Sequence, residues 1–369
     1  MSGTSLDGVD AAFLETDGAR IIRFGPRLLN PYRGEDRRAL ESATQAALRW
    51  QFKGTPPNSF AQVEAVIHAT HLNAVQALCA QAPEWAAKLD IIGFHGQTVL
   101  HHPATSTQKG LTLQLGDGQR LADALGVPVA YDFRQDDVQS GGQGAPLAPI
   151  YHKALVEYGE LSGVTAVLNL GGVGNVTLIS DGVPLMASDT GPANGPLDAW
   201  VSQHSVGEYD KGGEISLAGV PIFSKVEQWL KQGFFMRPVP RSADRYDFDV
   251  LADLKEASLE DGAASLATFS VQAVALTLSQ MQNDKTGGID TAIVCGGGRH
   301  NTAMMWMLSE HLGAKVITAE DVGWDSDAIE AQAFAFLAVR AQKNLPISFP
   351  LTTGVPRPMT GGKIATPKV

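Results

Sequence analysis

Apolar residues recur along the chain with two different spacings, one typical of strands and one typical of helices. The change of spacing separates the predicted elements. Short apolar runs bounded by Gly, Asp or Asn predict strands, and apolar positions three and four apart predict helices. The predicted strands cover residues 9–15, 21–29, 90–94, 111–115, 127–131, 164–170, 176–179, 183–187, 289–295 and 315–318. The predicted helices cover residues 35–51, 59–81, 116–125, 146–158, 194–205, 219–232, 258–283, 301–312 and 327–342.

Both halves of the chain open with the same order of features: a glycine-bearing turn, a strand, an Asp-Gly turn and another strand. Asp17-Gly18 follows Gly8 by about ten residues, and Asp181-Gly182 follows Gly174 by about eight. Strands followed by helices in both halves predict two related α/β lobes with a cleft between them. We expect the lobes to cover residues 1–144 and 145–369, with the helix at about 327–342 packing back on the first.

Composition narrows the class of protein. The 369 residues suggest two or three domains at roughly 150 residues each, and 44% apolar with 18% charged residues is typical of a globular chain. The net charge of −11 and the lack of a basic stripe disfavour nucleic acid. We find no apolar run of the ~18 residues that span a bilayer and expect no membrane partner. Cys79 and Cys295 stand far apart, which disfavours a disulfide scaffold and predicts a cytoplasmic protein.

Three glycine-rich turns follow or precede predicted strands, at Gly3–Gly8, Gly171–Asn175 and Gly296–Gly298. Backbone N–H groups in such turns can hold phosphoryl groups without any positive side chain. One turn alone is equally typical of a plain hairpin, but three at strand ends favour a phosphate site. The chain has neither the P-loop sequence nor the dinucleotide-binding glycine pattern, so a bound nucleotide requires another architecture.

The first of these turns also carries hydroxyl and acidic groups. Thr4 and Ser5 supply hydroxyls, and Asp7 supplies a carboxylate. An acid close to phosphates is favourable when Mg²⁺ lies between them, usually through water. We therefore expect Asp7 to contact Mg²⁺ through water.

Asp189 is the carboxylate that we single out as a candidate general base. It follows an apolar strand in Ser188-Asp189-Thr190-Gly191-Pro192. An aspartate at the carboxyl end of a strand, beside a glycine turn, is placed to face a cleft. The same pattern is equally compatible with a turn or N-cap aspartate for the following helix.

Four further polar residues are candidates for binding a substrate. His95 and Gln97 follow a buried strand into a predicted loop, and their polar tips suit a sugar hydroxyl or amide. Arg134 in the boundary loop can hold a carboxylate bidentately. Glu330 stands on an Ala/Phe-rich helix, where burial would require a partner or ligand. A satisfied loop histidine and a surface arginine remain open alternatives.

Seven stretches together carry a family resemblance. They are Met1–Asp10, Phe94–Thr98, Gln143–Leu147, Asn169–Asn175, Ser188–Pro192, Cys295–Asn301 and Asp327–Phe334. In this order they resemble the anhydro-N-acetylmuramic acid kinases of the actin-like ATPase superfamily. The resemblance implies an α/β fold of two ribonuclease-H-like lobes, in agreement with the duplication.

The resemblance also implies a reaction. ATP and water convert 1,6-anhydro-N-acetylmuramic acid, a product of peptidoglycan turnover, to N-acetylmuramic acid 6-phosphate and ADP. It implies that Asp189 activates the water, that His95, Gln97, Arg134 and Glu330 lie on the substrate side, and that the protein is a homodimer. The residues implied for ATP are Gly3, Thr4, Ser5, Leu6, Asp7, Gly8, Val9 and Asp10, then Gly171, Gly172, Gly174 and Asn175, and on the adenosine side Gly296, Gly297 and Gly298.

One departure from the family pattern concerns the first hairpin. The family usually has a short apolar strand before Ser-Gly-Thr-Ser, whereas here Met1 stands immediately before Ser2. We expect the hairpin to lack most of its leading strand, with an effect on ATP affinity. Two other functions remain open: a kinase for another anhydrosugar such as levoglucosan, and an actin-like nucleotide binder without turnover.

Overall fold

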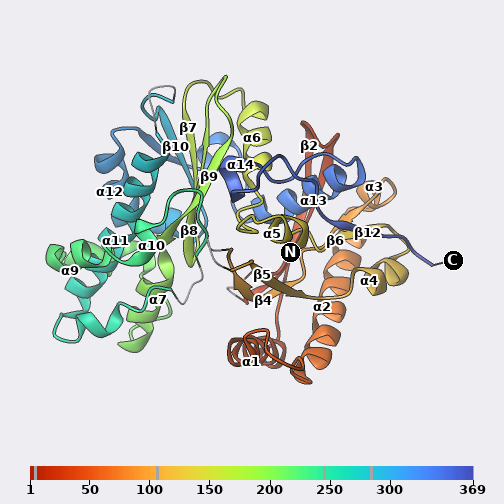
Figure 1. Cartoon of the computed structure of the whole chain (residues 1–369), viewed down its shortest axis with the longest axis horizontal. Helices are drawn as coiled ribbons and strands as arrows, with labels where there is room; N and C mark the ends of the chain where they lie inside the picture. The colour runs from red at the N-terminus through yellow and green to blue at the C-terminus, as the bar shows by residue number, and fades with distance from the viewer. Residues whose placement is uncertain (4–5, 105–107, 244–246, 283–285, 369) are drawn as a thin grey trace. The chain divides into compact units, whose positions relative to one another are not determined.

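The computed structural model shows a mixed α/β protein (Figure 1). It describes residues 1–3, 6–104, 108–243, 247–282 and 286–368. The chain forms two compact units. The first unit comprises Met1–Tyr158, Asp327–Pro350 and Gly354–Val369, and the second comprises Gly159–Ser326 and Leu351–Thr353.

The first unit takes in two helices from the chain beyond residue 144. Helices α6 (Pro149–Tyr158) and α13 (Ile329–Gln342) both lie in the first unit, although they follow residue 144. Leu337 and Ala338 of α13 are buried together with Ala130 and Phe133 of the first unit. The core of this unit thus takes in a helix from nearly the end of the chain.

The first unit contains three small sheets. Strand β1 (Gly8–Thr16) pairs antiparallel with β2 (Ile21–Pro31), and β4 (Gln97–His102) pairs antiparallel with β5 (Leu111–Leu115). The third sheet has the order β12-β6-β3, formed by Lys363–Ala365, Val129–Tyr131 and Ile92–Gly93. The other helices are α1 (Gly34–Trp50), α2 (Ser59–Gln81), α3 (Pro83–Ala86), α4 (Gly118–Leu125) and α5 (Gln135–Gln139).

Two strands of this unit were not expected. Gln97 opens β4, where we predicted a loop, and β12 lies in the part of the chain after residue 342, for which we predicted no helix or strand. Each is held by one neighbouring strand: β4 by β5, and β12 by β6. Pairing with a neighbour thus forms strands that the local sequence pattern alone did not predict.

The second unit is built on one five-stranded sheet with the order β11-β10-β7-β8-β9. The strands are β7 (Thr165–Leu170), β8 (Val173–Ile179), β9 (Met186–Pro192), β10 (Thr291–Cys295) and β11 (Lys315–Thr318). The helices are α7 (Asn194–Gln203), α8 (Glu214–Ala218), α9 (Phe223–Trp229), α10 (Gly233–Met236), α11 (Leu259–Met281) and α12 (Thr302–Leu312). The short helix α14 (Pro350–Thr353) follows near the end of the chain.

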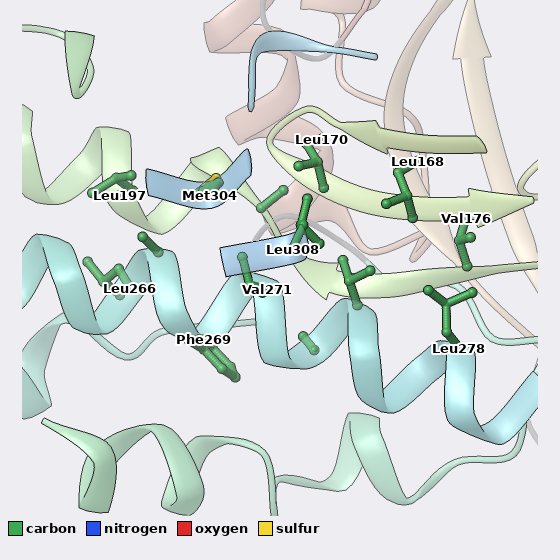
Figure 2. Close-up of a cluster of buried hydrophobic side chains, with 14 of the residues drawn as sticks. Leu168, Leu170, Val176, Leu197, Leu266, Phe269, Val271, Leu278, Met304 and Leu308 are labelled. Atoms are coloured by element: carbon green, nitrogen blue, oxygen red, sulfur yellow. The ribbon is translucent and has the colours of Figure 1, made fainter. Parts of the chain in front are cut away.

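Helix α11 fills the core of this unit. Figure 2 shows Leu278 of α11 directed towards Val176 of the sheet, whereas Phe269 points from the opposite side of the helix. The Phe269 ring packs there against Trp229 and Phe235, with centroid distances of 5.2 and 5.8 Å. By length and composition α11 meets the criteria of a membrane span, with a mean hydropathy of 1.3, which corrects our expectation that no apolar run is long enough. However, 78% of its most apolar window is buried in the structure, as in a core helix.

We expect Phe269→Ala to lower the free energy of unfolding by about 3–5 kcal/mol, because the ring is 0% exposed and its removal leaves a cavity. Phe223, which is 56% exposed, provides a control of the same chemistry. Phe223→Ala should change stability by no more than about 0.5 kcal/mol. Chemical denaturation of both variants compares the two values, and equal losses would contradict this packing.

Candidate active site

Three strands of the second unit end at the same edge of the sheet. β7 runs parallel to β10, and β9 has the same direction as β7 because both are antiparallel to β8. The pairing aligns Asn169, Asn175 and Asp189 in one row across β7, β8 and β9. Directly opposite residues of neighbouring strands share a face, so this row gathers three polar side chains near the glycine turns.

The turn after β10 lies directly against β7. A Cβ atom on Gly296 would lie 2.4 Å from Asn169 Oδ1, and Gly296 has a φ of +75°. A Cβ atom on Gly298 would lie 2.5 Å from Leu170 Cβ. Both positions therefore require glycine, and the turn at 296–298 is fixed beside the end of β7.

Asn194, which we did not single out from the sequence, connects the two turns. Its Nδ2 donates to Leu170 O at 2.8 Å, and its backbone N–H donates to Gly171 O at 2.8 Å. A Cβ atom on Gly297 would lie 3.2 Å from the same Nδ2. The turns at 171–172 and 296–298 therefore both lie next to the side-chain amide of Asn194. The only sequence signal for Asn194 is its place at the start of a predicted helix.

Asp189 lies within β9 rather than after it, and it is 7% exposed. Its backbone N–H donates to Arg241 O at 2.9 Å, and its Oδ2 accepts from the backbone N–H of Ala243 at 2.9 Å. The next helix has Ala193 at its N-cap, so Asp189 does not cap it. The carboxylate is thus held by the strand and by the segment 241–243.

Arg241 places a buried positive charge near Asp189. Its guanidinium donates to Arg237 O at 2.6 Å and to Thr277 Oγ1 at 3.0 Å. The pKa of Arg241 is lowered to about 10, first by burial and then by the charge of Arg237, while Asp189 opposes the decrease. Arg241 is still protonated at neutral pH, and its charge favours the ionised form of Asp189. The sequence pattern did not identify Arg241, because it lies about fifty residues away from Asp189.

The first hairpin, at 1–10, belongs to the first unit, and Thr4 and Ser5 lie outside the described residues. The amino group of Met1 donates to Asp10 O at 2.7 Å, and Asp10 N donates back to Met1 O at 2.9 Å. Asp7 is exposed, and its Oδ1 accepts from Gly8 N at 3.1 Å. Within the described residues no group of three or more His, Cys, Asp or Glu is placed to hold a metal ion.

Gln97 supports this hairpin. The side chain is 1% exposed, its Nε2 donates to Gly3 O at 3.3 Å, and its Oε1 accepts from Ser2 Oγ. Ser2 Oγ also lies 2.7 Å from the hydroxyl of Tyr32. Gln97 is therefore joined to the backbone of the first glycine turn.

His95 and Arg134 form a pair. Arg134 Nε donates to His95 Nε2 at 3.1 Å, and His95 Nδ1 lies 2.8 Å from Gly96 O. Because Nε2 accepts, the proton of the neutral ring is on Nδ1. Burial, and then the charge of Arg134, hold the pKa of His95 well below 6.5. Arg134 Nη1 also donates to Gly144 O at 2.7 Å, which fixes the guanidinium against the glycine-rich loop.

Glu330 lies in the first turn of α13 and is exposed, so our expectation that burial forces a partner on it is wrong. It acts electrostatically on Met1 and Asp10. The pKa of Asp10 is raised to about 6, mainly by burial, with smaller contributions from Asp7 and Glu330, while the amino group of Met1 opposes the rise. Glu330 therefore belongs to the electrostatic surroundings of the first hairpin.

Comparison with family models shows to which family this protein belongs. Residues 1–367 match the model described as anhydro-N-acetylmuramic acid kinase. The chain belongs to the anhydro-N-acetylmuramic acid kinase family. The match confirms the family and the kinase class that the motifs predicted.

Relatives cover the whole length of this family member. It is 44% identical over 367 residues to the anhydro-N-acetylmuramic acid kinase of Brucella anthropi, covering 99% of this chain and 97% of the relative. It is 45% identical over 369 residues to that of Phenylobacterium zucineum, covering 100% and 98%. Among solved structures, the activator of 2-hydroxyisocaproyl-CoA dehydratase from Clostridium difficile with bound ADPNP is 14% identical over 50% of this chain and 62% of that chain. Its TM-score of 0.30 is too low to establish a shared fold.

The protein should lose stability in acid through buried histidines of the first unit. Burial lowers the pKa of His71 to about 3 and of His101 and His152 to about 4, and His95 is also lowered. Between pH 6.5 and about 4 the unfolded chain therefore binds more protons than the folded one, and stability falls as the pH falls. Each histidine contributes at most about 1.4 kcal/mol per pH unit to the slope of the free energy of unfolding against pH. Asp10, with its pKa raised to about 6, contributes a slope of opposite sign, because it binds one proton in the folded protein before it does so in the unfolded chain.

Denaturant titrations across this pH range measure the slope. His152→Gln should reduce it by about one proton, because the side chain that titrates only in the unfolded chain is gone. A stability that stays constant or increases towards acid would contradict the burial of these rings as neutral groups.

Proposed function

We propose that this protein is the ATP-dependent kinase that converts 1,6-anhydro-N-acetylmuramic acid and water to N-acetylmuramic acid 6-phosphate, with ADP as the second product. The observation that supports this most strongly is the family match over residues 1–367. The reaction combines two events: the bond between C1 and O6 breaks, and O6 receives the γ-phosphoryl group. Such a kinase serves the recycling of peptidoglycan, and we assign it to the cytoplasm. The free thiols of Cys79 and Cys295 support a reducing compartment.

We assign the phosphates of ATP to the glycine turns. Gly171, Gly172, Gly174 and Asn175 form one phosphate hairpin, and Gly296, Gly297 and Gly298 form the adenosine-side turn, all in the second unit. The packing around Asn194 supports this, because phosphoryl transfer depends on positioning and electrostatics. The first hairpin, from Gly3 to Asp10, supplies the second set of phosphate contacts. Mg²⁺ keeps several waters and needs only one or two carboxylates besides phosphate, so the exposed Asp7 is sufficient for a water-mediated contact.

Asp189 acts as the general base in this proposal. It takes a proton from water as the water oxygen bonds to C1, and the electron pair of the C1–O6 bond passes to O6. O6 bonds to the γ-phosphorus as the bond from that phosphorus to the β,γ-bridging oxygen breaks, and ADP leaves with that electron pair. The hydrogen bond from Ala243 and the nearby charge of Arg241 support an ionised carboxylate ready to accept a proton.

The first unit supplies the proposed sugar contacts. Arg134 is a candidate partner for the lactyl carboxylate of the muramic sugar, and neutral His95 orients its guanidinium from behind. Gln97 and Glu330 complete the substrate side by family resemblance. We also propose a homodimer on that resemblance.

We expect Asp189→Asn to lower turnover by about 10²–10⁴-fold, because the amide cannot accept the proton. ATP binding, measured by calorimetry, should change little. Asp181→Asn in the exposed turn between β8 and β9 is the matched control and should keep full activity. If Asp189→Asn retained turnover within about threefold, another group would be the base.

The reaction in ¹⁸O-water tests the route of the water. Because water bonds to C1, mass spectrometry should find the label on the sugar and none in the phosphoryl group. Label in phosphate would indicate simple ATP hydrolysis and would contradict the proposal. Turnover of levoglucosan at the same rate as the muramic sugar would indicate that the substrate is another anhydrosugar, because levoglucosan has no lactyl carboxylate for Arg134 to bind.

A further inference from the structure

The glycine-rich loop at 141–144 closes on a buried carboxylate of the helix that precedes it. Asp137 lies in α5 and is 1% exposed. Its Oδ1 accepts from the backbone N–H of Gly144 at 2.7 Å, and its backbone oxygen accepts from the N–H of Gly142 at 2.9 Å. Burying a carboxylate costs free energy unless hydrogen bonds replace those to water. The loop therefore supplies donors that Asp137 needs in the interior, and Asp137 in turn fixes the loop.

Two glycines allow this close approach. A Cβ atom on Gly142 would overlap with Oδ1 of Asp137. A Cβ atom on Gly144 would lie 2.5 Å from Val138 Cγ2 on α5 and 3.0 Å from His101 Cε1 on β4. Gly144 also has a φ of +73°, which favours glycine. Gly144 is thus enclosed between α5 and β4, and its backbone cannot shift without displacing one of them.

The same glycine also holds Arg134. The N–H of Gly144 donates to Asp137, and its carbonyl oxygen accepts from Arg134 Nη1 at 2.7 Å. On its other side Arg134 donates through Nε to His95 Nε2 at 3.1 Å. The position of the guanidinium therefore depends on His95 and, through Gly144, on Asp137.

We propose that Asp137 is a positioning residue of the sugar site. Through Gly144 it sets the direction in which Arg134 presents its guanidinium to the lactyl carboxylate, and it thereby contributes to the preference for an anhydrosugar that carries a carboxylate. The inference rests on the proposed function, which gives Arg134 this partner. A guanidinium binds a carboxylate through two parallel N–H···O bonds of fixed direction, so a shift of its anchor weakens both bonds at once.

A purely structural role of Asp137 is the alternative. The residue lies in the first turn of α5, where a negative charge stabilises a helix. In that case the loss of Asp137 lowers the melting temperature and changes the constants for ATP and for the sugar alike. A positioning role changes the constant for the sugar alone.

Steady-state kinetics of the full chain with ATP and the muramic sugar distinguish the two roles. Asp137→Ala removes the acceptor for Gly144 and should raise the KM for the sugar by about tenfold or more, as expected when a hydrogen bond to a charged group is lost. The KM for ATP and kcat should change by less than about twofold, because a contact made equally before and during the reaction affects only the binding of that substrate. The exposed neighbour Asp136 provides the matched control, and Asp136→Ala should leave all three constants unchanged.

The conservative variant separates the hydrogen bond from the charge. Asp137→Asn retains an oxygen that can accept from the N–H of Gly144. Its KM for the sugar should stay within about threefold of the wild-type value, because the anchor of Arg134 is kept. Equal increases for Asp137→Asn and Asp137→Ala would overturn the proposal, since the charge and not Gly144 would then be the link.

A double-mutant cycle tests whether Asp137 acts through Arg134. Arg134→Ala alone should raise the KM for the sugar, and adding Asp137→Ala should raise it no further, because residues that act through one another are not additive. The same factor for Asp137→Ala with and without Arg134 would overturn the proposal.

Gly142→Ala gives a second route to the same result if Asp137→Ala does not fold. The added methyl group displaces the carboxylate while Asp137 stays in the chain, so the KM for the sugar should rise and the KM for ATP should not. A wild-type KM for the sugar in either folded variant would overturn the inference alone. Wild-type protein that does not phosphorylate the muramic sugar would contradict the proposed function and, with it, this inference.

Discussion

The close approach of glycine backbone to the end of β7 is the constraint on which the candidate site of the second unit depends. Gly296 and Gly298 leave no room for a side chain against Asn169 and Leu170. The turn after β10 can therefore lie beside the turn after β7, with Asn194 bonded to one and touching the other. This fit fixes the distance between the proposed phosphate hairpin and the proposed adenosine-side turn, and a displacement of about 1 Å can cost about 10²-fold in the rate of a positioned reaction.

Much of this arrangement could be predicted from the sequence, because it depends on local chemistry. The glycine turns and the strands before them were found from short patterns. Asp189 was expected after its strand, but β9 continues through it, since β8 on one side and Arg241 on the other supply hydrogen bonds. We did not identify Asn194 and Arg241 from the sequence, because their roles depend on contacts with residues that lie elsewhere in the chain. No local pattern of apolar and polar residues marks either position.

The first unit shows the same limit at β12, which forms in a Pro- and Gly-rich tail because β6 offers it an edge. Glu330 was expected to be buried from the apolar composition of its helix, yet it is exposed, whereas its neighbours Ile329 and Ala331 are buried. The composition of a helix gives only its average burial. Whether a single residue is buried depends on whether it lies on the side of the helix that faces the core.

The position of Asp189 on β9 has a consequence for local dynamics. β9 is the edge strand of its sheet, and edge strands carry backbone groups that no second strand satisfies. Here the segment around Arg241 covers that edge through the N–H of Asp189 and the hydroxyl of Ser188. Opening of this segment alone would release the proposed base while the five-stranded core stays folded. The exposure of the Asp189 carboxylate, the proposed base, is therefore tied to the opening free energy of one covering segment, and not to the global stability of the protein.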